Sequence, residues 1–195
     1  MNRRPPRILV FAGSIREGSL NRRLARLAAR LVQEAGGEAT WLELRDHPMP
    51  IFDADLEAAG GRPEAADRLR AAWLSHDGVL IASPEYNGSI SPLLKNAIDW
   101  VSRAVPGDDR SAYAGRVVGL MAASDGALGG TRALPQLRLV LSQLGALVLP
   151  RQVGVPHATQ VLLRDDGQVD DAATERRVAA LARDIVGLGR RLADG

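Results

Sequence analysis

Three short segments of the chain carry groups that bind anions or flat polar rings. The first segment is Gly13-Ser14-Ile15-Arg16-Glu17-Gly18-Ser19-Leu20-Asn21, where hydroxyl, guanidinium and amide donors are interspersed with glycine. At the start of a helix, backbone N–H groups are unpaired and the helix dipole favours negative charge. Charged and neutral donors added at such a point suit a phosphate monoester. The first segment therefore predicts a phosphate site.

Two familiar phosphate loops differ from this segment. Gly13 and Gly18 have the spacing of a Walker A loop, but Ser19 stands where that loop needs a lysine. The segment also lacks the G-x-G-x-x-G pattern of a dinucleotide-binding fold. A structural alternative stays open from these residues alone, in which Ser19 only caps a helix and Arg16 is a surface residue.

The other two segments have the composition of loops that enclose a flat heterocycle. One is Ser83-Pro84-Glu85-Tyr86-Asn87-Gly88-Ser89, with an aromatic ring and loop N–H groups, and the other is Ser124-Asp125-Gly126-Ala127-Leu128-Gly129-Gly130. The glycines of the latter permit close backbone approach to a ligand. Each segment also has a structural alternative, a plain Asn-Gly turn for the first and a flexible turn for the second.

The elements around these segments predict how they are positioned. Apolar runs indicate strands at 8–12, 40–44, 78–82, 116–123 and 146–155, the last interrupted by Pro150. Helices are expected from Leu20 until Gly36-Gly37, over 63–74, from Ser91-Pro92 onward, over 131–144 and over 172–192. Five strands alternating with five helices predict an α/β fold with a parallel sheet wound on both faces. In such a sheet ligands bind beyond the carboxyl ends of the strands, so the three segments should meet there.

Length and composition narrow the class of protein. The 195 residues suit a single domain over 1–195, with a core at about 7–155 and a C-terminal helix at about 172–192. Hydrophobic residues at 46% and charged residues at 25% are ordinary globular values. A net charge of +2 argues against nucleic-acid binding, which favours a concentrated basic face.

Several functions are disfavoured by what the chain lacks. Without cysteine there are no disulfides, thiol catalysis or Cys-held metals. The three histidines, His47, His76 and His157, have no paired ligand spacing, so no metal site is expected. No apolar run approaches the about 18 residues that suggest a membrane span. We therefore expect a cytoplasmic protein that neither spans a membrane nor binds metal.

The motifs resemble those of the NADPH-dependent FMN reductase family, which includes bacterial quinone, chromate and azo-dye reductases. The resemblance extends from about Arg7 to Val155. It rests on Gly13-Ser14-x-Arg16-x-x-Ser19-x-Asn21, on the segment 83–89, and on Leu94-Lys95-Asn96-Ala97-Ile98-Asp99-Trp100. It implies a flavodoxin-like five-stranded sheet of order 2-1-3-4-5.

The same resemblance implies an FMN site. Its phosphate residues would be Ser14, Arg16, Ser19 and Asn21. The isoalloxazine ring would be lined, largely through the backbone, by Pro84, Glu85, Tyr86, Asn87 and Gly88. The other edge of the ring would be approached by Ser124 and Gly126. Asp125 departs from the pattern, because an uncharged residue is expected at its position.

The implied activity is an exchange of electrons through FMN. NADPH or NADH would deliver hydride to the flavin, and a quinone-like or other small acceptor would then take the electrons. Three alternatives remain: a flavodoxin-type electron carrier, a reductase that supplies reduced FMN to a monooxygenase, and a phosphate-ester binding domain without flavin. A homodimer or homotetramer is implied as well. The stretch 46–61 is too long for a simple connection. Within it, the segment 47–53 would wall the acceptor pocket, cross to a second subunit, or form a surface loop anchored by Ile51 and Phe52.

Overall fold

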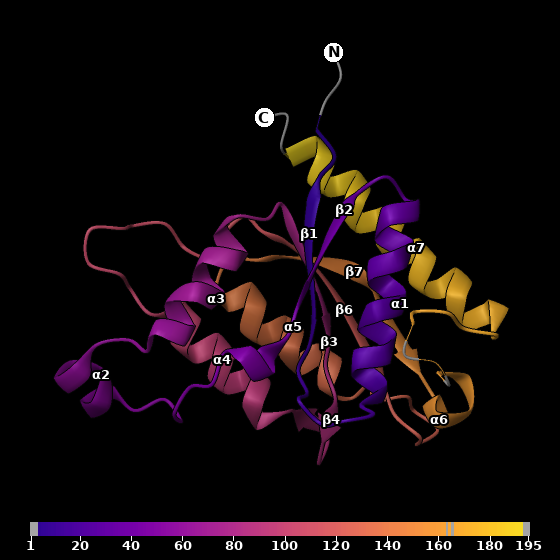
Figure 1. The fold of residues 1–195 in the computed structure, drawn as a ribbon, viewed down its shortest axis with the longest axis horizontal. Helices are drawn as coiled ribbons and strands as arrows, with labels where there is room; N and C mark the ends of the chain where they lie inside the picture. Colours follow the sequence, from indigo (N-terminus) through magenta and orange to yellow (C-terminus); the bar gives the residue numbers. More distant parts are fainter. Residues whose placement is uncertain (1–3, 163, 165, 193–195) are drawn as a thin grey trace.

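The structure is a computed structural model that describes residues 4–162, 164 and 166–192. Five parallel strands form its sheet in the order β2-β1-β3-β6-β7 (Figure 1). They are β1 (Arg7–Ala12), β2 (Glu38–Leu42), β3 (Gly78–Ala82), β6 (Val117–Ala123) and β7 (Leu147–Val155). A separate hairpin contains β4 (Glu85–Tyr86) and β5 (Ser89–Ile90). The flavodoxin-like order expected from the sequence is therefore confirmed.

The composition of each strand matches its place in the sheet. The central strands β3 and β6 are buried along their whole length, as parallel strands covered on both faces should be. The edge strand β2 alternates exposed and partly buried residues. Pro150 lies within β7, which is the opposite edge strand, where the missing N–H costs no ladder bond. The register between β6 and β7 shifts between Val118 and Leu120.

Arg138 covers part of the outer edge near Pro150. Its guanidinium donates to the carbonyl oxygen of Val148 at 3.0 Å and also to that of Leu149. Arg138 lies in α5 (Ala133–Gln143), the helix that precedes β7 in the chain. The Arg138 side chain thus joins the helix to the edge strand and provides hydrogen-bond donors for two carbonyl oxygens of that strand.

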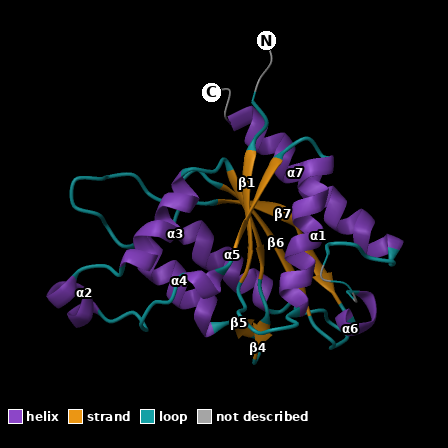
Figure 2. Cartoon of the chain, in the orientation of Figure 1, coloured by secondary structure: helices purple, strands orange, loops and turns teal. Residues whose placement is uncertain are grey.

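Helices cover both faces of the sheet (Figures 1 and 2). On one face α1 (Leu20–Glu34) and α7 (Ala172–Leu192) pack on β1, β3 and β6. On the other face lie α3 (Glu64–Leu74), α4 (Pro92–Ser102) and α5. Two further short helices are α2 (Ala54–Gly60) and α6 (Ala158–Val161). No described helix is both long and apolar enough to cross a membrane.

Some boundaries expected from the sequence were wrong. The second strand spans Glu38–Leu42 rather than 40–44, because Leu44 begins a 3-10 turn, Leu44–Asp46, and buries its side chain there. The helix expected over 131–144 begins at Ala133 and ends at Gln143. The segment 46–61, which is too long for a simple connection, contains α2, which has no buried residue and projects from the body of the molecule (Figure 1).

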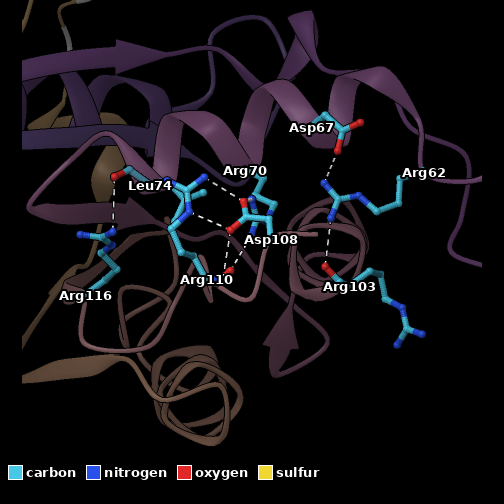
Figure 3. Close-up of polar contacts among 8 residues, drawn as sticks. All are labelled: Arg62, Asp67, Arg70, Leu74, Arg103, Asp108, Arg110 and Arg116. Carbon is cyan, nitrogen blue, oxygen red and sulfur yellow. Dashed lines mark hydrogen bonds and ion pairs between the residues drawn. The ribbon is translucent and has the colours of Figure 1, made fainter. Parts of the chain in front are cut away.

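The connection between α4 and β6 is held by arginines (Figure 3). Arg70 of α3 is buried and donates to the Asp108 carboxylate at 2.7 Å and to the carbonyl oxygen of Arg110. The guanidinium of Arg110 also donates to Asp108, at 2.7 and 2.8 Å. Arg62 donates to the carbonyl oxygen of Arg103 at 2.9 Å. These contacts hold the mostly exposed part of this connection, residues 103–110, in place.

Candidate functional site

The three segments singled out in the sequence meet at the carboxyl edge of the sheet. The N–H of Gly13 donates to the carbonyl oxygen of Ala82 at 2.9 Å, and the N–H of Ser83 donates to that of Met121 at 2.8 Å. The hydroxyl of Ser91 donates to the carbonyl oxygen of Gly13 at 2.7 Å. These bonds extend the sheet into the loops, so the ends of β1, β3 and β6 are fixed relative to one another.

A cavity of about 280 Å³ opens between these loops. Its lining comes from all three segments. The lining residues are Ser14, Arg16, Ser19, Leu20, Asn21, Pro84, Glu85, Tyr86, Ala123, Ser124 and Asp125.

One wall of the cavity combines hydroxyls with a cation, and we call Ser14, Arg16 and Ser19 the phosphate cradle. Ser19 caps α1, with its hydroxyl oxygen accepting from the N–H of Arg22 at 3.4 Å. The buried hydroxyl of Ser14 accepts from the N–H of Arg16, also at 3.4 Å. Arg16 is exposed, and no hydrogen bond joins its guanidinium to another described side chain. The first turn of α1 carries no acidic residue, so its dipole is left for an anion.

Asn21 reaches from α1 to the end of β6. Its amide donates to the carbonyl oxygen of Ala123 at 3.0 Å and accepts from the N–H of Ala123 at 2.9 Å. The side chain is buried, and its acceptor is already engaged. One amide hydrogen remains for a ligand. Asn21 therefore fastens the first and third segments together at the floor of the cavity.

The second segment is folded back as a hairpin around the Asn-Gly turn that the sequence left open as an alternative. Asn87 and Gly88 have φ of 52° and 79°, the two positive values that a type I′ turn requires. The hairpin is fastened to α5, because Gln136 donates to the carbonyl oxygen of Gly88 at 2.6 Å and accepts from the hydroxyl of Ser89 at 2.6 Å. These bonds hold the turn in place beside the cavity.

Glu85 lines the cavity, but its charge is directed to a partner. Its carboxylate accepts from the N–H and the guanidinium of Arg132 at 3.0 and 2.7 Å. The Glu85 side chain is only 8% exposed in this pair. The pairing neutralises the carboxylate. The hairpin therefore offers a ligand chiefly its backbone groups.

The third segment passes very close to the end of β7. At Gly129, where φ is +59°, an added Cβ would lie 2.6 Å from backbone atoms of Val155 and Pro156, so only glycine fits. Earlier in the same segment, Asp125 accepts from the N–H and hydroxyl of Thr159 at 2.7 and 2.6 Å. The Thr159 bonds, with His157 and Arg16 nearby, hold the pKa of the Asp125 carboxyl below its usual value.

Not every residue expected at the site lines the cavity. Asn87 and Gly88 form the tip of the hairpin, and Gly126 lies one residue beyond Asp125, all outside the lining. Leu20 and Ala123 line it without having been predicted. Supporting side chains also went unnoticed, since Arg132, Gln136 and Thr159 are far along the chain from the loops they hold.

The donor set fits FMN. The cradle offers two hydroxyls, a guanidinium and a helix N-terminus, which suit a phosphate monoester. Pro84 and Tyr86 add apolar surface to the lining, as a flat ring needs. Among the described residues, no group of three His, Asp or Glu side chains is arranged to hold a metal ion.

Fold and cavity together define a flavodoxin-like protein with a cavity at the carboxyl edge of its sheet. A family profile described as NADPH-dependent FMN reductase matches residues 6–160. The chain belongs to this family, and the resemblance drawn from its motifs is confirmed.

Individual relatives agree with this assignment. A quinone reductase of Escherichia coli strain K12 is 34% identical over 142 residues, which cover 73% of this chain and 72% of that protein. An NAD(P)H-dependent FMN reductase of Pseudomonas aeruginosa is 33% identical over 171 residues, covering 87% and 88%. The NAD(P)H:(acceptor) oxidoreductase FerB from Paracoccus denitrificans has a TM-score of 0.80 at 26% identity, covering 95% of this chain and 98% of that one.

Family membership establishes the general activity. The chain is an FMN-dependent oxidoreductase that uses NAD(P)H as electron donor. A flavodoxin from the domain Archaea shares the fold, with a TM-score of 0.62 at 10% identity. That likeness concerns the fold alone, and the alternative of an electron carrier is not favoured.

Proposed function

We propose that the chain passes electrons from NAD(P)H to a quinone-like or other small acceptor, with FMN held between the loops that follow β1, β3 and β6. The observation that carries this proposal is the cavity that joins the phosphate cradle to Pro84 and Tyr86. Bound FMN supplies the redox chemistry, in which hydride from NAD(P)H enters and electrons leave to the acceptor.

The chain's own residues bind and orient. In this proposal Ser14, Arg16 and Ser19 hold the phosphate, with Arg16 as the charged donor. Asn21 contributes its remaining amide hydrogen and keeps the cavity floor in place through Ala123. Ser124 and Gly126 belong to the loop that would approach the far edge of the ring.

The hairpin would supply the polar edge of the ring site. Because the Glu85 carboxylate is paired with Arg132, we infer that backbone N–H groups from Tyr86 through Asn87 to Gly88 meet the ring and stabilise negative charge on it. Tyr86 is 52% exposed and stands at the rim, where donor and acceptor would enter. The carboxylates of the lining, Glu85 and Asp125, are both engaged, which agrees with hydride transfer that needs no protein acid or base.

We also propose that the chain works as one domain in the cytoplasm and as a homodimer or homotetramer. The projecting segment around α2 supports the assembly, because Ile51 is 85% exposed and Leu56 is 44% exposed. Phe52 anchors this segment, with its ring 5.0 Å from that of Trp100. Light scattering of the wild type and of Ile51→Asp would test it, since a substitution at the contact should lower the oligomeric mass.

The proposed activity is tested with the purified chain and added FMN. Flavin absorbance should remain with the protein after gel filtration, and NAD(P)H oxidation should then depend on the presence of a quinone. Reduction of the quinone at an FMN concentration below that of the protein would show that the bound flavin turns over. If reduced FMN instead leaves the protein and a monooxygenase partner is needed, the quinone proposal fails.

A further inference from the structure

Asp125 places a carboxylate in the same cavity as the phosphate cradle. It lines the same cavity as Ser14, Arg16 and Ser19, although the family resemblance implies an uncharged residue at its position. Asp125 and Arg16 are close enough for their charges to interact. A phosphate monoester in the cradle would therefore meet an anion as well as a cation.

The position of Asp125 is fixed by α6. Its two carboxylate oxygens accept from the N–H of Thr159 at 2.7 Å and from the hydroxyl of Thr159 at 2.6 Å. These bonds favour the ionised form, and His157 and Arg16 act in the same direction on its pKa. The carboxylate cannot turn away to a distant partner without giving up both bonds, so its charge stays at the cavity.

The charges that line the cavity are few. Among the described lining residues the charged side chains are Arg16, Glu85 and Asp125. Arg132 neutralises Glu85 through an ion pair and a backbone hydrogen bond. What remains is one cation and one anion, which cancel. A phosphate monoester carries a charge of about −1.5 to −2 at neutral pH, so the Asp125 carboxylate offsets part of the attraction that Arg16 and the N-terminus of α1 supply.

We propose that Asp125 lowers the FMN affinity of this reductase by weakening the hold of the cradle on the FMN phosphate. The proposal rests on the FMN site described above. The charge of Asp125 should therefore affect the affinity for FMN but not the affinity for riboflavin, which lacks the phosphate. Asp125 binds nothing directly in this role, because its effect is electrostatic repulsion.

The test is a titration of FMN and riboflavin with wild type and Asp125→Asn, followed by quenching of flavin fluorescence. Asparagine keeps the size and an acceptor for the N–H of Thr159 but removes the charge. We expect the FMN dissociation constant of Asp125→Asn to fall by about 3- to 10-fold at low salt. The gain should shrink as salt is added, because exposed charges are then screened. Riboflavin affinity should stay unchanged.

Thr159→Val is the matched control, since it removes the hydroxyl bond and keeps the carboxylate. Its FMN affinity should not rise. The proposal is overturned if Asp125→Asn binds FMN no more tightly than wild type, if riboflavin gains as much as FMN, or if Thr159→Val gains as much as Asp125→Asn. Failure of the folded wild type to bind any FMN would instead refute the FMN site itself, and the role of Asp125 with it.

Discussion

Asn21 and Ala123 exchange two hydrogen bonds although they are 102 residues apart in the chain. The bonds join the first turn of α1 to the last residue of β6, and the side chain of Asn21 is buried where they form. A side chain that was expected only to bind phosphate therefore also connects two of the three loops. The residues of this site serve the fold and the ligand together.

Replacing Asn21 should lower both stability and flavin affinity. Asn21→Ala leaves the N–H and carbonyl oxygen of Ala123 without partners, which should cost about 1–3 kcal/mol of unfolding free energy. Urea denaturation and FMN titration would measure the two effects. Asn96→Ala is the control, because Asn96 also makes two backbone bonds, to Pro50 and Phe52, but does not line the cavity. It should leave FMN affinity unchanged, and an equal loss in both variants would contradict the role of Asn21.

Arg16→Ala should weaken FMN binding with little change in stability. The guanidinium is exposed and would donate a charged hydrogen bond to the phosphate, worth about 1.5–3 kcal/mol, or about 10- to 150-fold in the dissociation constant. Arg151→Ala is the matched control. Arg151 lies on the edge strand β7, pairs with Asp184 of α7, and does not line the cavity. Unchanged FMN affinity in Arg16→Ala would remove the charged contact from the proposed cradle.

Gly88→Ala should weaken FMN binding through the hairpin. No atom would obstruct the added Cβ, so the expected cost is that of the left-handed backbone, about 1–2 kcal/mol. Gly107→Ala is an equal test of backbone strain elsewhere, because Gly107 has φ of +76° and equally open surroundings. Both variants should lose stability, but only Gly88→Ala should raise the FMN dissociation constant. The same rise in both would show that the hairpin has no particular part in binding.

Arg70→Met should destabilise the chain without affecting flavin. The substitution keeps an apolar stem but removes the Arg70 donors to Asp108 and to the carbonyl oxygen of Arg110, while the Arg110 guanidinium still pairs with Asp108 (Figure 3). A loss of about 1–3 kcal/mol is expected, since the lost bonds involve a charged group, and it would appear as a lower midpoint in urea. Arg68→Met on the same helix is the control. Its exposed pair with Glu64 should contribute under about 1 kcal/mol.

The ion pair between Arg4 and Asp77 predicts a loss of stability in acid. Burial acts to raise the pKa of Asp77, but hydrogen bonds from Arg4 and from the N–H of Arg7 outweigh it and lower the pKa. A carboxyl with a lowered pKa in the folded state stabilises the fold while it is ionised. The contribution should be complete above about pH 4 and disappear as the pH falls further. In Asp77→Asn the free energy of unfolding, measured by urea denaturation at several pH values, should fall less steeply below about pH 4. The same fall as in the wild type would contradict the role of this ion pair.

The central part of the fold could be predicted because each central strand is a continuous apolar run. Residues 78–82 were predicted as a strand with its observed bounds, since burial on both faces leaves no ambiguity. The edge strand β2 was less well predicted, because alternation continues through Leu44 although the strand ends at Leu42. The periodicity of apolar residues does not show where a strand ends and a 3-10 turn with a buried side chain begins.

The candidate site was predicted unevenly for a related reason. Residues next to each other in a motif, such as Ser14 and Arg16, are visible as a group in the sequence. The partners of the loops are not, since Arg132 lies 47 residues from Glu85 and Thr159 lies 34 residues from Asp125. Their pairing follows from how α5 and α6 pack, which no local pattern encodes. The hairpin of residues 85–90 is an intermediate case, because Asn87-Gly88 is a recognisable type I′ turn.

The outer edge of β7 bears on how the molecule behaves in a crowded solution. An open edge strand is a template onto which another chain can add a strand, and this is a common route to aggregation. Here Pro150 offers no N–H to an incoming strand, and Arg138 occupies the carbonyl oxygens of Val148 and Leu149. The β7 edge of the sheet is thereby protected against the addition of a strand from another molecule.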